Sequence, residues 1–203
     1  IELLVRSGPE RIQELMDWGT QFSEKEGPGG RVLDLGREGG HSKNRIVHAR
    51  DLTGQEVERA LLKKVSEIKN IQLFEDHTGV DLLTEHQLKI KGTKRNAIHC
   101  YGAYILDNTT GMVNTFNAKM TLLATGGVGQ VYLHTTNPEI ATGDGIAMAY
   151  RAGALIADME FIQFHPTGLY RPGTKPFLIS EALRGEGGRL VDQSGRAFME
   201  HAH

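Results

Sequence analysis

The class of fold follows from Thr121-Leu122-Leu123-Ala124-Thr125-Gly126-Gly127, an apolar run that ends abruptly at two glycines. Residues 118–125 are predicted to form a buried strand, because a short apolar run bounded by a turn signal is typical of one. A buried strand that ends in a glycine pair occurs in sheets that present the carboxyl edge of their strands to a ligand. The sequence therefore predicts an α/β fold with a ligand site at this edge.

A second glycine-rich motif, Thr142-Gly143-Asp144-Gly145, follows shortly and precedes a predicted helix over residues 145–154. It places Asp144 near the positive end of the helix. Asp144 is then either a simple helix cap or a contact to the hydroxyls or bridging atoms of a nucleotide cofactor. Gly127-Val128-Gly129 and Gly143-Asp144-Gly145 both lack the third glycine of the dinucleotide fingerprint, so neither identifies a Rossmann site by itself.

The other predicted elements are helices and short strands. Apolar spacing, with a proline suited to a first turn, predicts a helix over residues 9–22. Thr53 is predicted to be the N-cap of an amphipathic helix, with Glu56 as its capping-box partner. Short strands are predicted at residues 45–49, 71–74, 80–84, 97–106 and 112–117, the last two joined by the turn signal Asp107-Asn108-Thr109-Thr110-Gly111.

The length, charge and composition of the chain argue against several classes of function. A length of 203 residues fits one domain or two small ones, and a net charge of −2 argues against nucleic acid or an anionic membrane as the main partner. No apolar run is long enough to span a bilayer. The single cysteine, Cys100, excludes an internal disulfide and fits a reducing cytoplasm. The 25 glycines show no collagen-like period and indicate tight turns and ligand sites lined by backbone.

Gln163-Phe164-His165-Pro166-Thr167 places three hydrogen-bonding side chains in alternation. Pro166 favours an extended conformation for the residue before it, so Gln163, His165 and Thr167 share one face. These side chains are suited to binding a carboxylate. A lone histidine is more often structural, but metal binding is disfavoured because no second ligand lies at the required spacing. We predict no metal site.

Ser180-Glu181-Ala182-Leu183-Arg184 is followed by Gly185-Glu186-Gly187, and a similar glycine-framed cluster occurs at Arg37-Glu38-Gly39-Gly40-His41-Ser42. If the first segment is helical, Glu181 and Arg184 lie at positions i and i+3. They then form either a surface ion pair on a capped helix or an acid–base chain that relays protons into a closed site.

Six motifs together resemble the succinate dehydrogenase/fumarate reductase flavoprotein superfamily, and within it the L-aspartate oxidases. They are Arg-Glu-Gly-Gly-His-Ser, Leu-Leu-Ala-Thr-Gly-Gly, Thr-Thr-Asn-Pro, Thr-Gly-Asp-Gly-Ile-Ala-Met-Ala, Gln-Phe-His-Pro-Thr and Glu-Ala-Leu-Arg-Gly-Glu-Gly. The resemblance extends from about residue 9 to the end of the chain. It implies a part of an FAD-binding Rossmann-like domain with a β-meander over residues 1–167, and the start of an α+β capping domain over residues 168–203.

The resemblance also implies roles for single residues. FAD would contact the backbone at Ala124, Thr125, Gly126 and Gly127, and would contact Asp144. Gln163, His165 and Ser180 would bind a substrate carboxylate, and Glu181 and Arg184 would relay protons.

Glu38 distinguishes the branches of the superfamily. The dicarboxylate enzymes typically lack an acid there, whereas L-aspartate oxidases carry one to bind the substrate ammonium. The implied reaction is oxidation of L-aspartate to iminoaspartate by hydride transfer to flavin, with oxygen or fumarate as acceptor. The product feeds quinolinate and NAD synthesis in the cytoplasm, with a possible functional coupling to quinolinate synthase.

Two alternatives remain at this point. The chain could come from a fumarate reductase or succinate dehydrogenase flavoprotein, with Glu38 incidental. It could instead be a non-catalytic nucleotide-binding or assembly module, in which the glycine-rich loops only hold a ligand.

We expect the isolated 203-residue chain to bind FAD weakly or not at all and to be inactive. The superfamily's strand with its G-x-G-x-x-G and the later His and Arg residues of the second carboxylate site are not in this sequence. Tight, stoichiometric quenching of flavin fluorescence by the isolated chain would contradict this expectation.

Overall fold

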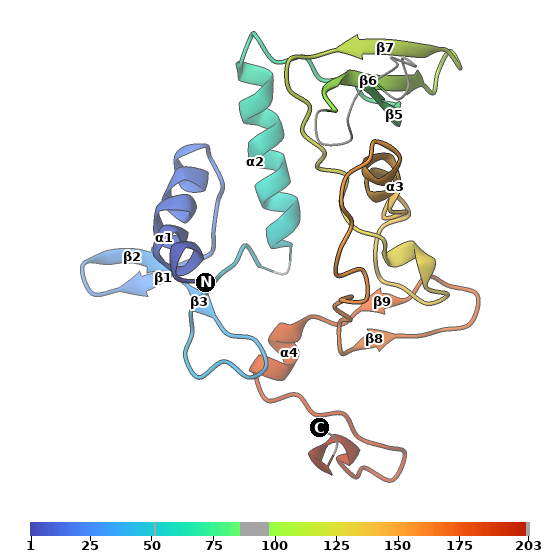
Figure 1. Ribbon diagram of the computed structural model, residues 1–203. Helices are drawn as coiled ribbons and strands as arrows, with labels where there is room; N and C mark the ends of the chain where they lie inside the picture. Colours follow the sequence, from blue (N-terminus) through green and yellow to red (C-terminus); the bar gives the residue numbers. More distant parts are fainter. Residues whose placement is uncertain (51, 86–97, 202–203) are drawn as a thin grey trace. The chain divides into compact units, whose positions relative to one another are not determined.

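The computed structural model describes residues 1–50, 52–85 and 98–201 (Figure 1). The chain divides into two compact units. Unit 1 comprises Ile1–Gln72 and Ile179–His203, and unit 2 comprises Leu73–Leu178. Both contain helices and strands, so the chain is a mixed α/β structure, as predicted. The first residue of the predicted strand 97–106 lies outside the described residues.

Unit 1 contains three helices, two small antiparallel hairpins and a 3₁₀ turn within its described residues. Strands β1 and β2 pair with each other, and so do β3 and β4. The elements are α1 (Glu2–Asp17), β1 (Glu24–Gly27), β2 (Gly30–Leu33), β3 (Leu35–Gly36), β4 (Ile46–Val47), α2 (Thr53–Glu67), α4 (Glu181–Gly185) and η3 (Phe198–His201).

The predicted limits of the first helix were wrong. Helix α1 begins at Glu2 and ends at Asp17, with Pro9 in its interior. An ion pair between Arg6 and Glu2 (2.8 Å) supports the turn before the proline. The helix ends where the amide N–H of Thr20 donates to the carbonyl of Leu15 (2.9 Å), which turns the chain away from the helix axis.

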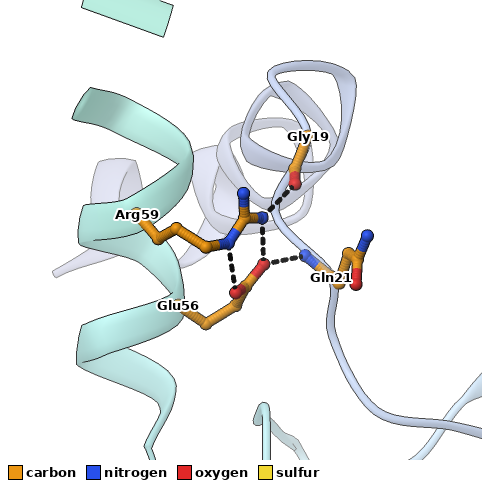
Figure 2. Close-up of polar contacts among 4 residues, drawn as sticks. All are labelled: Gly19, Gln21, Glu56 and Arg59. Carbon is orange, nitrogen blue, oxygen red and sulfur yellow. Dashed lines mark hydrogen bonds and ion pairs between the residues drawn. The ribbon is translucent and has the colours of Figure 1, made fainter. Parts of the chain in front are cut away.

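Helix α2 is confirmed, but its predicted capping box is not. The N-cap is Leu52, without a side-chain cap. The Glu56 carboxylate instead accepts hydrogen bonds from the Arg59 guanidinium (2.6 and 2.7 Å) and from the Gln21 amide (2.7 Å) (Figure 2). Arg59 also donates to the Gly19 carbonyl (2.9 Å). Arg59 and Gln21 together satisfy the carboxylate, so Glu56 links α2 to the segment after α1 rather than capping its own helix.

Unit 2 is built around a three-stranded antiparallel sheet in the order β5-β6-β7. The predicted hairpin and its turn are confirmed: the Asp107 carboxylate accepts from the backbone N–H and the hydroxyl of Thr109, which holds the pKa of Asp107 well below its usual range. The elements are β5 (His77–Thr84), β6 (Cys100–Asp107), β7 (Val113–Asn117), η2 (Gly129–Val131), α3 (Asp144–Arg151), β8 (Gly168–Leu169) and β9 (Phe177–Leu178).

Helix α3 packs against β5 in unit 2. Met148 is 3% exposed, and its terminal methyl would lie 3.5 Å from a Cβ placed on Gly79. Arg151 donates to the Asp81 carboxylate (3.1 Å) and to the Val80 carbonyl (3.1 Å). These contacts fix the helix that follows the glycine-rich loop, with Leu82 and Leu83 completing the small buried core.

The predicted strands at residues 118–125 and 71–74 are wrong. No described strand pairs with either segment, and Met120 and Leu122 are each 89% exposed. A strand is stable only when its backbone groups are paired with a neighbour, so an apolar run without a described partner stays irregular.

The surface is large for the chain length. The accessible area is 16554 Å², whereas two separate folded units of these sizes would expose about 11,000 Å² in total. The excess includes large apolar side chains such as Leu122 and Leu155. No helix in the described part of the chain combines the length and apolar composition that crossing a membrane requires.

Replacing Glu56 with Gln is expected to lower stability in a pH-dependent way. Hydrogen bonds from Arg59 and then Gln21 lower the pKa of Glu56 from 4.5 to about 2. A carboxylate whose pKa is lowered by folding contributes its full stabilisation above the unfolded-state pKa. That stabilisation is lost as the pH falls through the folded-state pKa. The urea midpoint of the Glu56→Gln variant should therefore lie below wild type at pH 6, and the difference should vanish as the pH falls from about 4.5 towards 2.

Glu58→Gln is the matched control, because Glu58 lies in the same helix, is exposed and has no described partner for its side chain. Its midpoint should follow wild type at every pH. A Glu56→Gln deficit that stays constant from pH 6 to pH 3 would contradict this interpretation.

Candidate functional site

The Thr125–Gly127 loop is held against the start of α3. The amide N–H of Gly143 donates to the Gly127 carbonyl (3.2 Å). The Thr125 side chain packs so closely on Gly145 that a Cβ there would overlap the threonine Oγ1. Helix α3 therefore positions this loop in unit 2.

The backbone of the loop is open on its other side. A Cβ placed on Gly126 or Gly127 would meet nothing within 4 Å, and Ala124 is exposed. Asp144 is the first residue of α3 rather than its N-cap, which is Gly143. Its Oδ2 accepts from the Thr142 hydroxyl (2.8 Å), and among the described residues nothing donates to its Oδ1. The loop thus offers the open backbone of Gly126 and Gly127, and the start of α3 offers a carboxylate oxygen without a described donor.

A hollow of about 490 Å³ lies beside this loop, within unit 2. Its lining brings together Gly127, Gln163 and His165, which belong to motifs far apart in the sequence. The predicted cofactor-binding and carboxylate-binding segments therefore meet in one cavity.

His165 is fixed through one ring nitrogen. Its Nδ1 lies 3.2 Å from the Thr167 amide nitrogen and 3.0 Å from the Thr167 carbonyl oxygen. If Nδ1 accepts from the amide, the neutral ring carries its proton on Nε2, and an imidazolium carries protons on both nitrogens. In either state Nε2–H can donate to a carboxylate. Gln163 is exposed, and its amide makes no hydrogen bond within the described chain.

The hollow has aromatic walls that the sequence did not reveal. His134 and Tyr170 pack edge to face (5.0 Å between centroids, 68°), and so do Tyr132 and Phe164 (5.0 Å, 70°). Only the neighbouring Thr-Thr-Asn-Pro motif indicated this segment, and nothing in the sequence distinguished His134 from the other histidines. These rings make one wall of the cavity apolar.

The Glu181–Arg184 pair is present on α4 in unit 1. Arg184 donates to Glu181 Oε1 at 3.0 Å, and the two side chains are 47% and 20% exposed. Ser180 caps the helix, since its Oγ accepts from the Ala182 amide (3.3 Å). A capping hydroxyl uses only a lone pair, so its O–H can still donate to a ligand.

The Glu38 loop contacts α4 directly. A Cβ on Gly39 would lie 2.9 Å from Glu181 Oε2 and 3.4 Å from Arg184 Cζ. The Glu38 side chain is exposed and makes no hydrogen bond or ion pair with any described residue. The structure therefore places the backbone of Glu38, whose side chain has no described partner, against the helix that carries the predicted proton-relay pair. No cluster of three or more potential metal ligands occurs in residues 1–50, 52–85 and 98–201.

The model of the FAD binding domain family matches residues 1–203. The chain belongs to this family. It is 50% identical to L-aspartate oxidase 1 of Ralstonia nicotianae over 97% of its length, and 49% identical to the chloroplastic L-aspartate oxidase of Oryza sativa over 98%. A solved quinol-fumarate reductase superposes with a TM-score of 0.82 and is 34% identical over 97% of the chain.

The chain spans only part of these relatives: 36% and 31% of the two oxidases, and 31% of the reductase chain. The family match indicates FAD as the cofactor. The residues fit FAD, because the open backbone at Gly126 and Gly127 lets a nucleotide approach more closely than it could if these residues had side chains.

Gly145→Ala should destabilise the protein that contains this chain, although alanine favours helix by about 1 kcal/mol over glycine. The new methyl group would overlap the Thr125 hydroxyl, and such overpacking costs roughly 1–3 kcal/mol. Gly54→Ala is the matched control: Gly54 is also the second residue of its helix, and a Cβ there meets nothing within 4 Å. Thermal unfolding should show a lower midpoint for Gly145→Ala and an equal or higher one for Gly54→Ala. The reverse order would show that Thr125 moves freely.

Proposed function

We propose that this chain is part of an FAD-dependent L-aspartate oxidase, which converts L-aspartate to iminoaspartate. The observation that carries the proposal is the Glu38 carboxylate, which has no described partner and lies on a loop in contact with Glu181 and Arg184. A substrate with an ammonium group supplies a positively charged partner for the Glu38 carboxylate, whereas a plain dicarboxylate does not. Identity of 50% to an L-aspartate oxidase supports the same substrate.

Binding of the carboxylates falls to side chains with free donors. Nε2–H of His165 and the amide of Gln163 line one hollow and hold one carboxylate of the substrate. The Ser180 hydroxyl donates a hydrogen bond to a substrate carboxylate, while its oxygen accepts the hydrogen bond that caps α4. These contacts orient the α-carbon of the substrate and limit its motion.

The oxidation removes a hydride and a proton. When bound, FAD supplies the acceptor for the hydride. The backbone of Ala124, Thr125, Gly126 and Gly127 and the carboxylate of Asp144 hold the cofactor. Glu181 and Arg184 move the proton, because a carboxylate hydrogen-bonded to a guanidinium can pass a proton along without leaving its position.

We further propose the arrangement of the whole protein. Residues 1–167 belong to a Rossmann-like FAD-binding domain whose β-meander includes β5, β6 and β7, and residues 168–203 open a capping domain. Oxygen or fumarate reoxidises the flavin. The enzyme works in the cytoplasm, where iminoaspartate passes to quinolinate synthase for NAD synthesis.

A fumarate reductase or succinate dehydrogenase flavoprotein is the second candidate. It is favoured by the structural similarity to quinol-fumarate reductase, and it would leave Glu38 without a charge to bind. A non-catalytic nucleotide-binding module is the third candidate. A yellow, FAD-containing protein without turnover on any dicarboxylate would support it.

Glu38→Gln in the complete flavoprotein should raise the KM for L-aspartate roughly 10- to 100-fold, because a hydrogen bond between charged groups contributes about 1.5–3 kcal/mol. The KM for fumarate should not change, since fumarate has no ammonium group. Steady-state oxidation of L-aspartate and reduction of fumarate measure both effects.

Glu26→Gln is the control: Glu26 lies in the β1–β2 hairpin with its side chain 87% exposed. It should behave as wild type with both substrates. A wild-type protein that oxidises succinate but not L-aspartate would overturn the proposal.

A further inference from the structure

We propose that Arg37 is a positioning residue that fixes Glu38 beside Glu181 and Arg184 and so determines preference for an ammonium-bearing substrate. This inference rests on the proposed function. All four residues belong to unit 1.

Arg37 joins two segments that are far apart in the sequence. Its Nε donates to the Gly185 carbonyl at 2.8 Å, in a partly buried hydrogen bond. That carbonyl belongs to the last turn of α4, where helix carbonyls lack partners within the helix. The Arg37 guanidinium therefore satisfies an acceptor that the helix leaves open, and it does so from the residue next to Glu38.

The two segments touch along their backbones as well. A Cβ on Gly185 would overlap the Arg37 carbonyl oxygen and would lie 3.3 Å from Glu38 Cα. A Cβ on Gly39 would lie 2.9 Å from Glu181 Oε2. The Arg37 hydrogen bond thus closes a contact in which residues 37–39 lie directly on α4.

The loop is also held by strand pairing and by contacts within itself. Strands β3 and β4 pair through Leu35 with Val47 and Gly36 with Ile46. The Glu38 amide donates to His41 Nδ1 (3.2 Å), and the His41 amide donates to the Glu38 carbonyl (3.1 Å).

Both backbone groups of Glu38 are consequently engaged, while its side chain has no described partner. The position of the Glu38 carboxylate therefore depends on the conformation of the loop. Among the described contacts of the loop, the Arg37 side chain provides the hydrogen bond to α4, so its loss should displace Glu38 relative to Glu181 and Arg184.

The test compares Arg37→Met, which keeps the apolar stem but removes the donor, with Arg37→Lys, which keeps a donor and the charge. Lys43→Met removes one positive charge from the same loop and serves as control, since the Lys43 side chain is exposed and has no described partner. All variants are made in the complete flavoprotein and must retain wild-type FAD content.

We expect Arg37→Met to raise the KM for L-aspartate roughly 3- to 10-fold, as loss of one positioning hydrogen bond would. The KM for fumarate should stay within about twofold of wild type. Arg37→Lys should recover part of the loss, and Lys43→Met should match wild type. Equal losses on both substrates would overturn the proposal, because they would indicate general damage.

A double-mutant cycle isolates the coupling. In a Glu38→Gln background, Arg37→Met should change the KM for L-aspartate by less than about twofold, because the residue it positions no longer carries charge. Fully additive effects would overturn the proposal.

Amide hydrogen exchange reports on the contact without turnover. Residues 37–45 should exchange at least about fivefold faster in Arg37→Met than in wild type or Lys43→Met. Exchange at the wild-type rate overturns the role of Arg37 whatever the substrate is. A wild-type protein that fails to oxidise L-aspartate overturns the proposed function alone, and the exchange rates then still decide whether Arg37 holds the loop.

Discussion

The Glu38 loop and helix α4 approach each other so closely that no Cβ would fit at Gly185, and a Cβ at Gly39 would displace the Glu181 carboxylate. Gly39 faces the Glu181 carboxylate and Gly185 faces the Arg37 carbonyl. The hydrogen bond from Arg37 to Gly185 joins the segments at 2.8 Å across most of the chain's length. The role that we propose for Glu38 depends on this contact, because it brings the backbone of residues 37–39 to the helix that carries Glu181 and Arg184. In the proposed enzyme, recognition of charge and movement of protons thus share one small structural element.

In unit 2, a similar close contact supports the cofactor-binding and carboxylate-binding roles that we propose. Thr125 packs on Gly145, where no Cβ would fit, and this contact holds the Gly126–Gly127 backbone with its other face open. The hollow beside it reaches Gln163 and His165. In each unit, glycine permits a close contact within the chain. The group left open to a ligand beside it is the backbone of Gly126 and Gly127 in unit 2 and the side chain of Glu38 in unit 1. The arrangement explains why glycine and ionisable residues occur together in this sequence.

Local patterns predicted the elements that depend on local forces. Helix α2 and the β6–β7 hairpin formed as expected, since an apolar stripe and a turn signal act over a few residues. Residues 118–125 did not form a strand, because pairing requires a neighbour and none is present among the described residues. The predicted capping box is absent because Glu56 is bound by Arg59 and by Gln21. The bond to Gln21 depends on where the segment after α1 lies against α2. The local pattern was therefore overridden by a tertiary contact at Glu56 and by the lack of a described one at residues 118–125.

In the candidate site, too, the sequence predicted residues marked by a local motif and not those that depend on remote contacts. Motifs identified Glu38, His165 and Glu181 as residues of interest, because each stands in an unusual local sequence. They could not identify Arg37, whose partner Gly185 is remote in the sequence, or the aromatic wall formed by His134 and Tyr170. A motif indicates which residues have unusual chemistry, but it does not indicate what holds them in place. In the function that we propose, one ammonium group distinguishes the substrate from its analogues, so the position of the Glu38 carboxylate would decide specificity. Residues that hold the Glu38 loop would then contribute to specificity without touching the ligand.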